Sequence, residues 1–565
     1  MTWKQRLGSG SVLLAALCVA CVGQIDEPTE RAGSGPGTTG GPGSSGTTDR
    51  PAVCAEGVCV QGSALARLTR AQYANSVRQL LGSAVVLDVT HLPQDHAAAE
   101  IFSSNESVSA SADDVDRYSA IAEDLAAAAD LKALLACDVT SGDKACAEQL
   151  VRDLGEKAYR RPVSPEEVTA YAELYDGVRG EGDSFEDATR LIIATMLQSP
   201  SFLYLVEQGG SDAPRQLDGR EVAVRLAYFL WREAPDAALL AAATAGKLDN
   251  KAGVEAAARG MMDDPRFDRA IREFFGEWLG LGQLDGLGRD PAQYPQFGDS
   301  LISAMQEETE RFAVHVFRND SGSQKALLSA SYSIVNPELA QLYGVTPQKA
   351  SGFAQVELPN RSGILTQPSV LTATATEGFT TPIFRGIFIR TRVLCHSLAP
   401  RPANVDEAIA EIEKTLSPNM DDRARLTALT GQGECAGCHL LTNQIGFGFE
   451  HYDAIGSFRT KDYSGAPVDP SATIEGGSEE YATDVDAPYD DALQMTQALA
   501  SSESVGQCLT LQWLRYALGR DARGEASSMD QAYNAYSNAN LDLRELVVAI
   551  TGSDAFRYRV TPSLD

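Results

Sequence analysis

The sequence predicts a mainly α-helical protein, with several helical modules in series and few short strands. Two observations predict this class. Beyond residue 64, most segments repeat apolar residues at the spacing of an amphipathic helix, and several of them open with a helix-capping pattern. The chain has 565 residues, 44% of them apolar, which is enough for roughly three or four domains with real cores. No fixed-period repeat is evident.

The N-terminal half holds the clearest helix starts. Thr69 and Gln72 form a capping-box pattern before a helix that stops at Gly82. Ser164, followed by Pro165 and by a Glu three residues on, is a stronger start. Further helices are predicted over residues 114–135, 185–205, 218–230, 264–278, 299–317 and 336–344.

The chain changes character at 354–381, where Gly, Pro, Ser and Thr are frequent and the apolar runs are too short for helices. Loops with up to two short strands fit this stretch best. Helices return at 385–394, 421–429, 502–518 and 541–550, and between them lie a Pro-containing connector at 399–404 and an acidic loop at 462–491. The C-terminal part is therefore expected to be rich in loops.

The chain is strongly acidic, with 77 Asp and Glu against 47 Lys and Arg and a formal net charge of −30. Proteins that bind nucleic acids present basic surfaces, so this balance disfavours nucleic acid as a partner. It also disfavours attraction to an anionic lipid surface. A solvated, exported protein fits the composition.

The first residues predict export. Lys4 and Arg6 precede an apolar run at 12–20, which is too short to span a bilayer and is typical of a secretory signal. Cys18-Val19-Ala20-Cys21 resembles a bacterial lipobox, with Cys18 where Leu is usual. We expect a lipid anchor at Cys21, followed at 33–48 by a flexible Gly/Ser/Thr/Pro linker. The expected location is the periplasm, the outer membrane or the cell surface.

The remaining cysteines predict disulfides. Of the ten cysteines, two belong to the signal and two to a C-x-x-C-H motif, which leaves six. An even number in an oxidising compartment indicates three disulfides, and six cysteines allow fifteen connectivities. Short separations favour Cys54–Cys59 and Cys137–Cys146, and Cys395–Cys508 is then left by elimination. The alternative is that some of the six are buried free thiols.

The stretch that carries chemistry is Cys435-Ala436-Gly437-Cys438-His439. C-x-x-C-H is the attachment sequence of a c-type haem, because two thiols at this spacing can add to the two vinyl groups of a porphyrin. The adjoining imidazole is then placed as the proximal iron ligand. The small pair between the cysteines lets the backbone turn tightly against the ring. The sequence thus predicts one haem c, attached at Cys435 and Cys438 and ligated by His439.

Several neighbouring residues are candidates to complete such a site. Met495, on a predicted helix after a long loop, is the first candidate for a distal ligand. Further candidates are Met420, Met529, His396 and His451. An empty sixth position would instead permit binding of a small gas or peroxide.

Two further groups of residues could surround the ring. The glycines 446, 448 and 456 could let backbone approach it, and the aromatic residues 447, 449 and 452 could wall it; the alternative is an ordinary glycine-rich turn with core aromatics. Guanidinium groups suit propionates or another anion, with surface ion pairs as the alternative. The candidates are Arg361, Arg385, Arg390 and Arg392.

Other readings of the motif stay open. Cys435, Cys438 and His439 with Cys395 or His396 could bind structural zinc, or the two motif cysteines could form a disulfide. Zinc sites of this spacing prefer reducing compartments, so the expected export argues against zinc. A dithiol redox pair would need a βαβ setting, which the predicted helical surroundings do not supply. Glu450 and Asp453 form a weak paired-carboxylate pattern for hydrolysis. No G-x-S-x-G, H-E-x-x-H or Walker-type phosphate loop is present in the sequence.

Motifs along the whole mature chain carry a resemblance to a known family. In chain order they are Leu68-Thr69-Arg70-Ala71-Gln72-Tyr73, Tyr159-Arg160-Arg161-Pro162, Arg225-Leu226-Ala227-Tyr228-Phe229-Leu230-Trp231, Arg361-Ser362-Gly363-Ile364-Leu365-Thr366 with the C-x-x-C-H, and Tyr516-Ala517-Leu518-Gly519-Arg520. The chain resembles secreted multidomain proteins of planctomycetes and myxobacteria built around the domain of unknown function 1592, several of them labelled planctomycete cytochrome-like. One departure is Asn443-Gln444, where the family often has Asp-Pro.

The resemblance implies a modular architecture. The expected parts are a signal peptide with lipobox at 1–21, a linker at 22–63, helical modules at 64–150, 151–210 and 211–350, a loop-rich c-type-haem-like module at 351–485 and a C-terminal helical module at 486–565.

The function expected from these observations is that of an exported mono-haem c-type cytochrome-like protein. It would serve electron transfer or redox support of an extracytoplasmic process, with a redox partner protein or a small electron carrier. The alternatives are a non-enzymatic surface or binding protein with the motif as a disulfide or zinc staple, and an extracellular polymer-degrading enzyme.

Overall fold

The computed structural model describes residues 52–98, 101–106, 108, 110–139, 142–207, 212–398, 412, 416, 420–432, 435–476 and 481–560. The expected signal sequence, the lipid anchor at Cys21, the stretch at 33–48 and the connector at 399–404 lie outside these residues. The described part is mainly α-helical, with few short strands, which confirms the predicted fold class.

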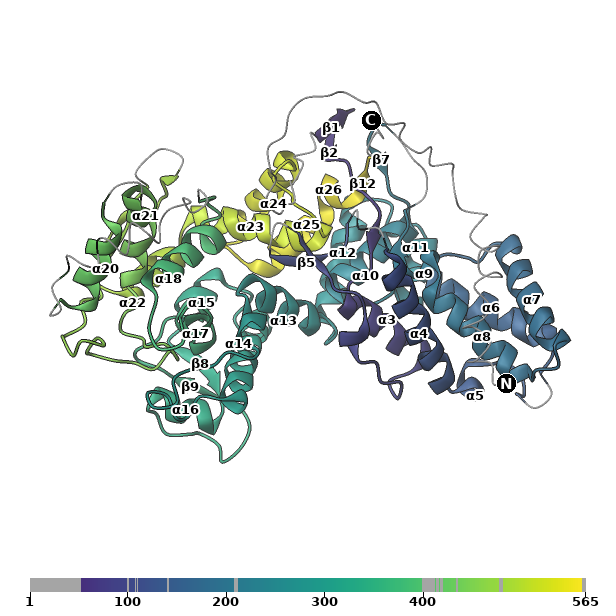
Figure 1. Cartoon of the computed structure of the whole chain (residues 1–565). Helices are drawn as coiled ribbons and strands as arrows, with labels where there is room; N and C mark the ends of the chain where they lie inside the picture. Colours follow the sequence, from purple (N-terminus) through teal and green to yellow (C-terminus); the bar gives the residue numbers. More distant parts are fainter. Residues whose placement is uncertain are drawn as a thin grey trace, which may run out of the picture.

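The helices form an elongated molecule (Figure 1). The N-terminal helices lie at one end, and the helices of residues 299–499 lie at the other. The C-terminal helices lie between these two groups, against the central helices of residues 219–278. The last module of the sequence therefore returns to the middle of the molecule.

The N-terminal group packs around a core of its own, in which the ring of Tyr73 contacts Tyr118 and Phe202. The capping boxes predicted at Thr69 and Ser164 are both formed. The helix predicted at 114–135 is two helices, because Asp130 caps a new one. The helices of this group are α3 (Arg70–Leu81), α4 (Ala112–Ala128), α5 (Leu131–Leu134), α6 (Lys144–Tyr159), α7 (Pro165–Gly180), α8 (Phe185–Gln198) and α9 (Pro200–Leu203).

The central and C-terminal helices share the main core. Phe274 stacks on Trp513, with ring centroids 3.8 Å apart, so two helices far apart in sequence are in direct contact. The central helices are α10 (Gly219–Leu230), α11 (Ala237–Thr244), α12 (Lys251–Asp263) and α13 (Phe267–Trp278). The C-terminal ones are α23 (Glu503–Leu518), α24 (Ala526–Asn538), α25 (Leu543–Gly552) and α26 (Asp554–Arg557).

The third group carries the C-x-x-C-H motif. Its helices are α14 (Asp299–Asn319), α15 (Gln324–Ser329), α16 (Pro337–Tyr343), α17 (Pro368–Ala373), α18 (Pro382–Phe388), a π-helical turn η5 (Ile389–Val393), α20 (Asp422–Thr430), α21 (Cys435–Phe447) and α22 (Ala492–Leu499). The prediction of loops and strands at 354–381 was wrong for α17. Pro368 at the first helical position was the signal for that helix.

The strands are short, and each described pair is antiparallel. Strands β7 and β12 pair the residues just before α10 with those just after α26, which ties the C-terminus to the central group. The pairs are β1 (Ala52–Ala55) with β2 (Val58–Gln61), β3 (Ala66–Arg67) with β6 (Tyr204–Leu205), β4 (His96–Ala98) with β5 (Phe102–Ser104), β7 (Arg215–Gln216) with β12 (Tyr558–Arg559), β8 (Tyr332–Val335) with β9 (Ala354–Glu357), and β10 (Ala472–Ile474) with β11 (Ala487–Tyr489).

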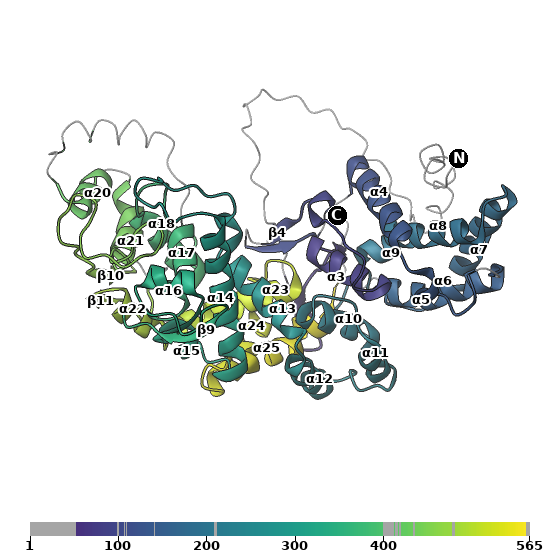
Figure 2. The ribbon, with the colours of Figure 1, turned by 90° about the horizontal axis from the view of Figure 1, so that it is seen from below.

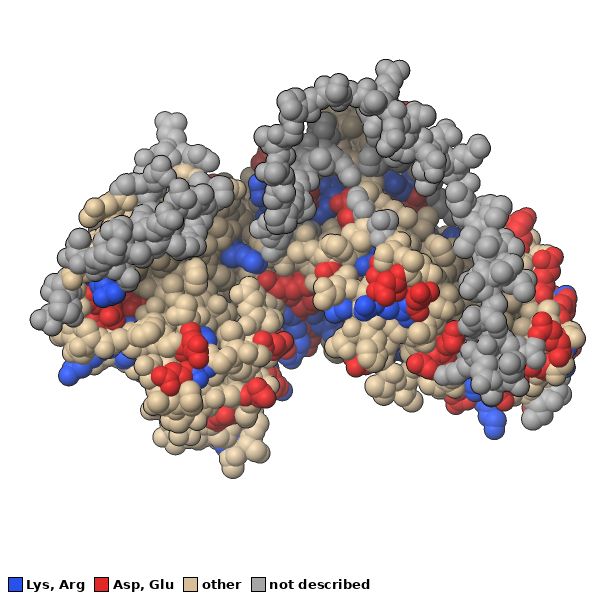
Figure 3. All heavy atoms as spheres, in the orientation of Figure 1, with Lys and Arg blue, Asp and Glu red and all other residues tan. Residues whose placement is uncertain are grey.

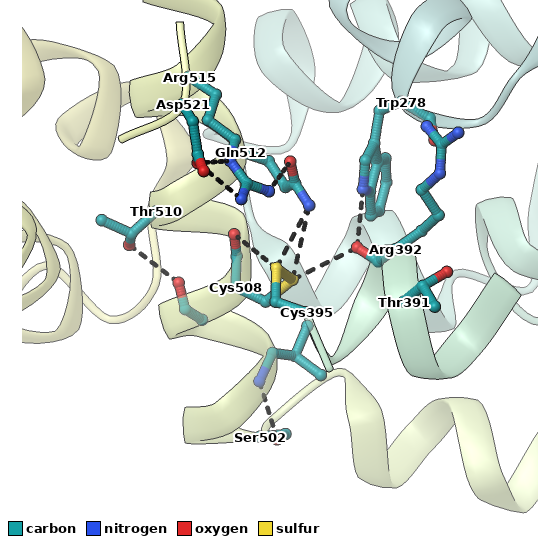
Figure 4. Close-up of a disulfide and its surroundings, with 12 residues drawn as sticks. Trp278, Thr391, Arg392, Cys395, Ser502, Cys508, Thr510, Gln512, Arg515 and Asp521 are labelled. Carbon is teal, nitrogen blue, oxygen red and sulfur yellow. Dashed lines mark hydrogen bonds and ion pairs between the residues drawn. A yellow bond between two sulfur atoms is a disulfide. The ribbon is translucent and has the colours of Figure 1, made fainter. Parts of the chain in front are cut away.

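All three predicted disulfides are present: Cys54–Cys59, Cys137–Cys146 and Cys395–Cys508. The third joins the segment after η5 to α23 across 113 residues of sequence (Figure 4). Gln512 donates from Nε2 to Sγ of Cys395 at 3.2 Å, and Trp278 donates from Nε1 to the carbonyl of Arg392 at 2.9 Å. This junction therefore links the motif-bearing group to both α13 and α23.

A buried carboxyl group lies in the core beside α14. Glu308 is fully buried; its Oε1 accepts hydrogen bonds of 2.6 Å from Ser333 and Tyr343, and its Oε2 has no partner. Burial raises the pKa of Glu308 to about 7. The guanidinium of Arg361 lies over the rings of Tyr343 and Tyr452, which connects this cluster to the turn after α21.

We expect the Cys395–Cys508 disulfide to stabilise the middle of the molecule. In the loop-closure model, replacing both cysteines with Ser costs about 5 kcal/mol of unfolding free energy, against about 2 kcal/mol for the short Cys54–Cys59 loop. Urea unfolding followed by fluorescence of Trp278 and Trp513 measures the difference. Equal losses from the two double variants would contradict this assignment.

We also expect Glu308 to make stability depend on pH. Its pKa is higher in the folded state than in the unfolded chain, so its contribution is complete below about pH 4.5 and is lost as the pH rises through about 7. Glu308→Gln should remove a fall in unfolding free energy on the order of 3 kcal/mol between those pH values. Thermal unfolding at pH 5 and pH 8 tests this, with Glu307→Gln on the surface of the same helix as control. Parallel pH profiles for wild type and Glu308→Gln would rule it out.

Candidate functional site

The C-x-x-C-H motif forms the first turns of α21. The tight backbone turn expected at Ala436-Gly437 is absent, because both residues are helical. Helical spacing places positions 435, 438 and 439 on one side of α21. Cys438 is a half-buried free thiol, and His439 beside it is also half-buried. The motif thus presents a thiol and an imidazole together at the start of a helix.

A hydrogen-bond relay fixes the imidazole of His439. Nδ1 lies 3.0 Å from Oδ1 of Asn443, one helical turn on. The amide of Asn443 donates from Nδ2 to Oγ1 of Thr430 at 2.8 Å, and Thr430 donates to the carbonyl of Leu426 at 2.8 Å. Because Asn443 presents its oxygen to the ring, this geometry favours the tautomer of His439 with the proton on Nδ1. The lone pair of Nε2 is therefore available to a metal.

Asn443 was missed as a functional residue by the sequence analysis. In the sequence it stands out only as a departure from the Asp-Pro that the family often has, and both Asn443 and Gln444 lie inside α21. An Asn or Asp four residues after a ligating His on a helix is the signal that could have found it, since residues at i and i+4 face each other. Thr430, on α20, has no such local signal.

Helix α21 packs closely against α18, and the two lie side by side in both views (Figure 1 and Figure 2). At Gly386 an added Cβ would lie 1.9 Å from the carbonyl oxygen of Thr442, and at Gly446 it would lie 1.8 Å from that of Pro382. Each helix thus contributes a glycine where the backbones meet. The approach at 386–442 and 382–446 also shows that the two helices run antiparallel.

The arginines expected to bind propionates or an anion instead bind backbone carbonyls. Arg385 donates to the carbonyls of Phe449, Tyr452 and Asp453 at 2.7 to 3.0 Å, and so holds the turn after α21. Arg390 is fully buried and donates to the carbonyl of Leu441 at 2.9 Å.

The other two arginines have comparable roles. Arg361 donates to the carbonyls of Thr366 and Gly456, and Arg392 donates to those of Glu277 and Trp278. All four side chains thus donate to backbone carbonyls of the fold.

The glycines and aromatic residues after the motif also serve packing. Gly446 lies against α18, Gly448 against Met495 and Gly456 against Pro368. The close contacts at these glycines are therefore with the protein itself and not with a porphyrin ring. The side chains of Phe447, Phe449 and Tyr452 are buried. The alternative of an ordinary glycine-rich turn with core aromatics is therefore the correct one.

Glu450 and Asp453 do not form a hydrolytic pair. Glu450 is buried; Arg385 and Arg459 pair with its two oxygens, and Thr380 donates to Oε2 at 2.8 Å. Asp453 accepts the backbone N–H groups of Ile455 and Ser457 at 3.0 and 2.8 Å. Burial raises the pKa of Asp453, but its hydrogen bonds stabilise the turn. Both carboxyl groups are structural.

The disulfide and zinc readings of the motif are also disfavoured. Cys438 is a free thiol, so it forms no disulfide. Cys395, one proposed fourth zinc ligand, is bonded to Cys508. His396, the other, lies 3.4 Å from a guanidinium nitrogen of Arg390, and its pKa is lowered by burial and by that charge. No group of three or more potential metal ligands occurs among the side chains that the structure describes.

The distal-ligand candidates lie in different surroundings. Met495 is fully buried in the main core on α22, and its methyl group lies 3.2 Å from the Cβ position of Gly448. Gly448 is about 13 Å further along the α21 axis than His439. His451 contacts the carbonyl of Arg459 through Nδ1 at 2.9 Å, and Met529 packs against the core from α24. The distal role of Met495 stays a prediction.

Comparison with protein-family models covers most of the described chain. Five models match, each described as a protein of unknown function: DUF1587 at residues 66–130, DUF1595 at 146–207, DUF1592 at 217–345, DUF1588 at 361–462 and DUF1585 at 486–556. Their order agrees with the order of the sequence motifs. The chain belongs to the family built around DUF1592.

The family consists of planctomycete cytochrome-like domains, and the DUF1588 match, named PSCyt3, contains the C-x-x-C-H motif. No curated protein and no solved structure matches the chain significantly. Among the described residues, every helix is too short or too polar to cross a bilayer. The names of the matching domains therefore support a cytochrome-like protein.

We expect Asn443 to set the tautomer of His439. In the protein made without haem, wild type should show the Nδ1-protonated ring, whereas Asn443→Leu should show a mixture because the acceptor is lost. Asn443→Asp keeps an acceptor and is the matched control. The ring ¹⁵N shifts of selectively labelled histidine, of which the chain has six, report the tautomer. An unchanged tautomer in Asn443→Leu would show that the relay does not control it.

Proposed function

We propose that this chain is an exported c-type cytochrome-like protein that carries one covalent haem and transfers electrons outside the cytoplasm. The thiols of Cys435 and Cys438 would form the thioether bonds, and Nε2 of His439 would be the axial ligand from this chain. When bound, the haem supplies a one-electron couple at its iron. The cytochrome-like domain names support this reading.

The observation that carries the proposal is the oriented imidazole of His439 beside the free thiol of Cys438. Histidines that bind metals usually donate their other ring N–H to a fixed acceptor, which sets the tautomer and the ring orientation. Asn443 is such an acceptor, and it is itself held by Thr430. A histidine beside a disulfide staple would not need this arrangement.

The rest of the module suits a site that must stay rigid. The glycine contacts between α18 and α21 fix the helix; the buried side chain of Arg390 holds its middle, and that of Arg385 holds the turn after it. Leu440, next to His439, is 48% exposed, which is expected for an apolar side chain beside an apolar cofactor. Small changes of geometry during electron transfer favour fast exchange, so a rigid mount fits the proposed role.

Export and partners complete the proposal. The three disulfides are compatible with an oxidising compartment. The lipobox-like sequence would place a lipid on Cys21 and hold the protein at a membrane surface. The electron donor or acceptor would be a redox partner protein or a small electron carrier, and the acidic charge of −30 argues against nucleic acid.

A pyridine haemochrome spectrum tests the proposal. The mature chain, made together with the cytochrome c maturation machinery, should show a c-type band and the added mass of one haem. Cys435→Ala/Cys438→Ala should lose both signals completely, because no thiol remains for attachment. The control Cys54→Ala/Cys59→Ala should keep them. Folded wild-type protein that is colourless and of unmodified mass would contradict the proposal.

The same preparation tests Met495. A Met ligand raises the haem potential, so Met495→Leu should lower the potential if Met495 is the distal ligand. Leu fills a similar volume, which limits the loss of core packing. An unchanged potential would remove Met495 from the site and leave His439 as the ligand from this chain.

A further inference from the structure

A cavity of about 520 Å³ lies beside the motif-bearing helix. It is lined by four segments of the chain: residues 379–383 leading into α18, residues 421–429 of α20, Phe447 and Glu450 at the end of α21, and the loop at 462–469. Pockets for small organic ligands have volumes of about 300–1,000 Å³. Among the described residues, neither Cys438 nor His439 lines this cavity.

The walls of the cavity are largely apolar. The side chains of Pro382, Ile383, Leu426, Leu429 and Phe447 line it. Phe447 is buried, and the guanidinium of Arg423 covers its ring at 4.2 Å. Apolar walls contributed by several segments are typical of pockets for small organic molecules, and here charged side chains line the rest of the cavity.

An exposed aromatic residue belongs to the same lining. Phe379 is 56% exposed, and its ring lies edge-on to that of Tyr463, with centroids 5.1 Å apart. Tyr463 is held from behind, since its hydroxyl lies 3.0 Å from that of Tyr294 and the guanidinium of Arg459 lies over its ring. The Phe379–Tyr463 pair thus presents a fixed aromatic surface with one open ring, which favours a planar aromatic ligand.

The charges of the lining disfavour an anion. Five carboxylates line the cavity, against the two guanidinium groups of Arg423 and Arg425. Arg423 pairs with the carboxylate of Asp469 at 3.5 Å, and Arg385 and Arg459 pair with Glu450. Three carboxylates of the lining then stand against the guanidinium group of Arg425. The lining therefore keeps a negative surplus, which attracts a cation, tolerates a neutral molecule and repels an anion.

We propose that this cavity is a binding site for a small planar aromatic molecule that is neutral or positively charged. The aromatic pair at Phe379 and Tyr463 and the apolar walls give the preference for an aromatic ring, and the acidic residues give the selection by charge. The site does not depend on the proposed haem. Helix α21 carries the C-x-x-C-H motif and also contributes Phe447 to the cavity wall. A small aromatic ligand would therefore bind against the helix that carries His439.

Isothermal titration of the full chain with three thiol-inert probes tests the proposal. The probes are 1-naphthylmethylammonium, 1-naphthalenemethanol and naphthalene-1-sulfonate. We expect the cation and the neutral probe to bind with dissociation constants in the range of about 10 μM to 1 mM, as suits ligands of this size. The sulfonate should bind at least tenfold more weakly, by about 1.4 kcal/mol.

Three variants localise the binding. Leu429→Trp should fill the cavity and abolish binding, and Phe379→Ala should weaken it about tenfold while leaving the core intact, because Phe379 is exposed. Asp421→Asn should reduce the preference for the cation over the neutral probe; Asn keeps the helix cap that Asp421 provides to α20. Phe458→Ala is the matched control, since Phe458 is 42% exposed but lies against His451, outside the lining.

Several outcomes would overturn the proposal. They are no binding of any probe at millimolar concentration, equal binding of the sulfonate, and unchanged binding in both Leu429→Trp and Phe379→Ala. Haem-free and haem-loaded protein should bind the probes equally. Binding by the haem-free form alone would show that the haem itself fills the cavity, and would also overturn the proposal.

Discussion

The antiparallel contact between α18 and α21 is the constraint on which the candidate site depends. Gly386 and Gly446 allow the two backbones to meet, since a Cβ at either position would overlap a carbonyl of the other helix. Arg385 then holds the turn that follows α21, and Arg390 holds its middle from a fully buried position. Both arginines lie on or directly after α18, so one short segment fixes the helix that presents Cys438 and His439. The hydrogen bonds from His439 to Asn443 and from Asn443 to Thr430 also tie α21 to α20.

This arrangement explains why the motif lies in a rigid part of the molecule rather than on a loop. The group of helices around α21 is joined to α23 by the Cys395–Cys508 disulfide and to α13 through Trp278 and Arg392 (Figure 4). The C-terminal helices are in turn part of the central core. On the face shown in Figure 3, acidic and basic side chains are interspersed over the described surface. On this face the acidic residues are therefore not gathered in a single patch. The buried guanidinium groups of Arg385 and Arg390 instead hold the backbone of the motif-bearing module.

Features set by neighbouring residues could be predicted from the sequence. The capping boxes at Thr69 and Ser164 depend on residues three positions apart, and the short disulfides depend on cysteines five and nine positions apart. The motif itself is local and was recognised as such. The roles of residues whose partners are distant in sequence could not be predicted. Arg385 was expected to meet an anion, but its carbonyl partners lie more than sixty residues away and only the fold brings them close. The role of Asn443 could not be predicted, because it depends on residues 435–447 forming a helix, and no helix was predicted there. The fold class was predictable, and the support of the imidazole was not.

The central claim is that Nε2 of His439 is directed to an iron atom while Nδ1 is held by Asn443. Anomalous X-ray scattering at the iron edge, from crystals of the chain made with the cytochrome c maturation machinery, tests this most directly. The account predicts one iron peak per chain, at bonding distance from Nε2 of His439 and on the side of the ring away from Asn443. An iron peak elsewhere, a peak at the zinc edge instead, or no metal beside a folded and oxidised Cys435–Cys438 pair would contradict it.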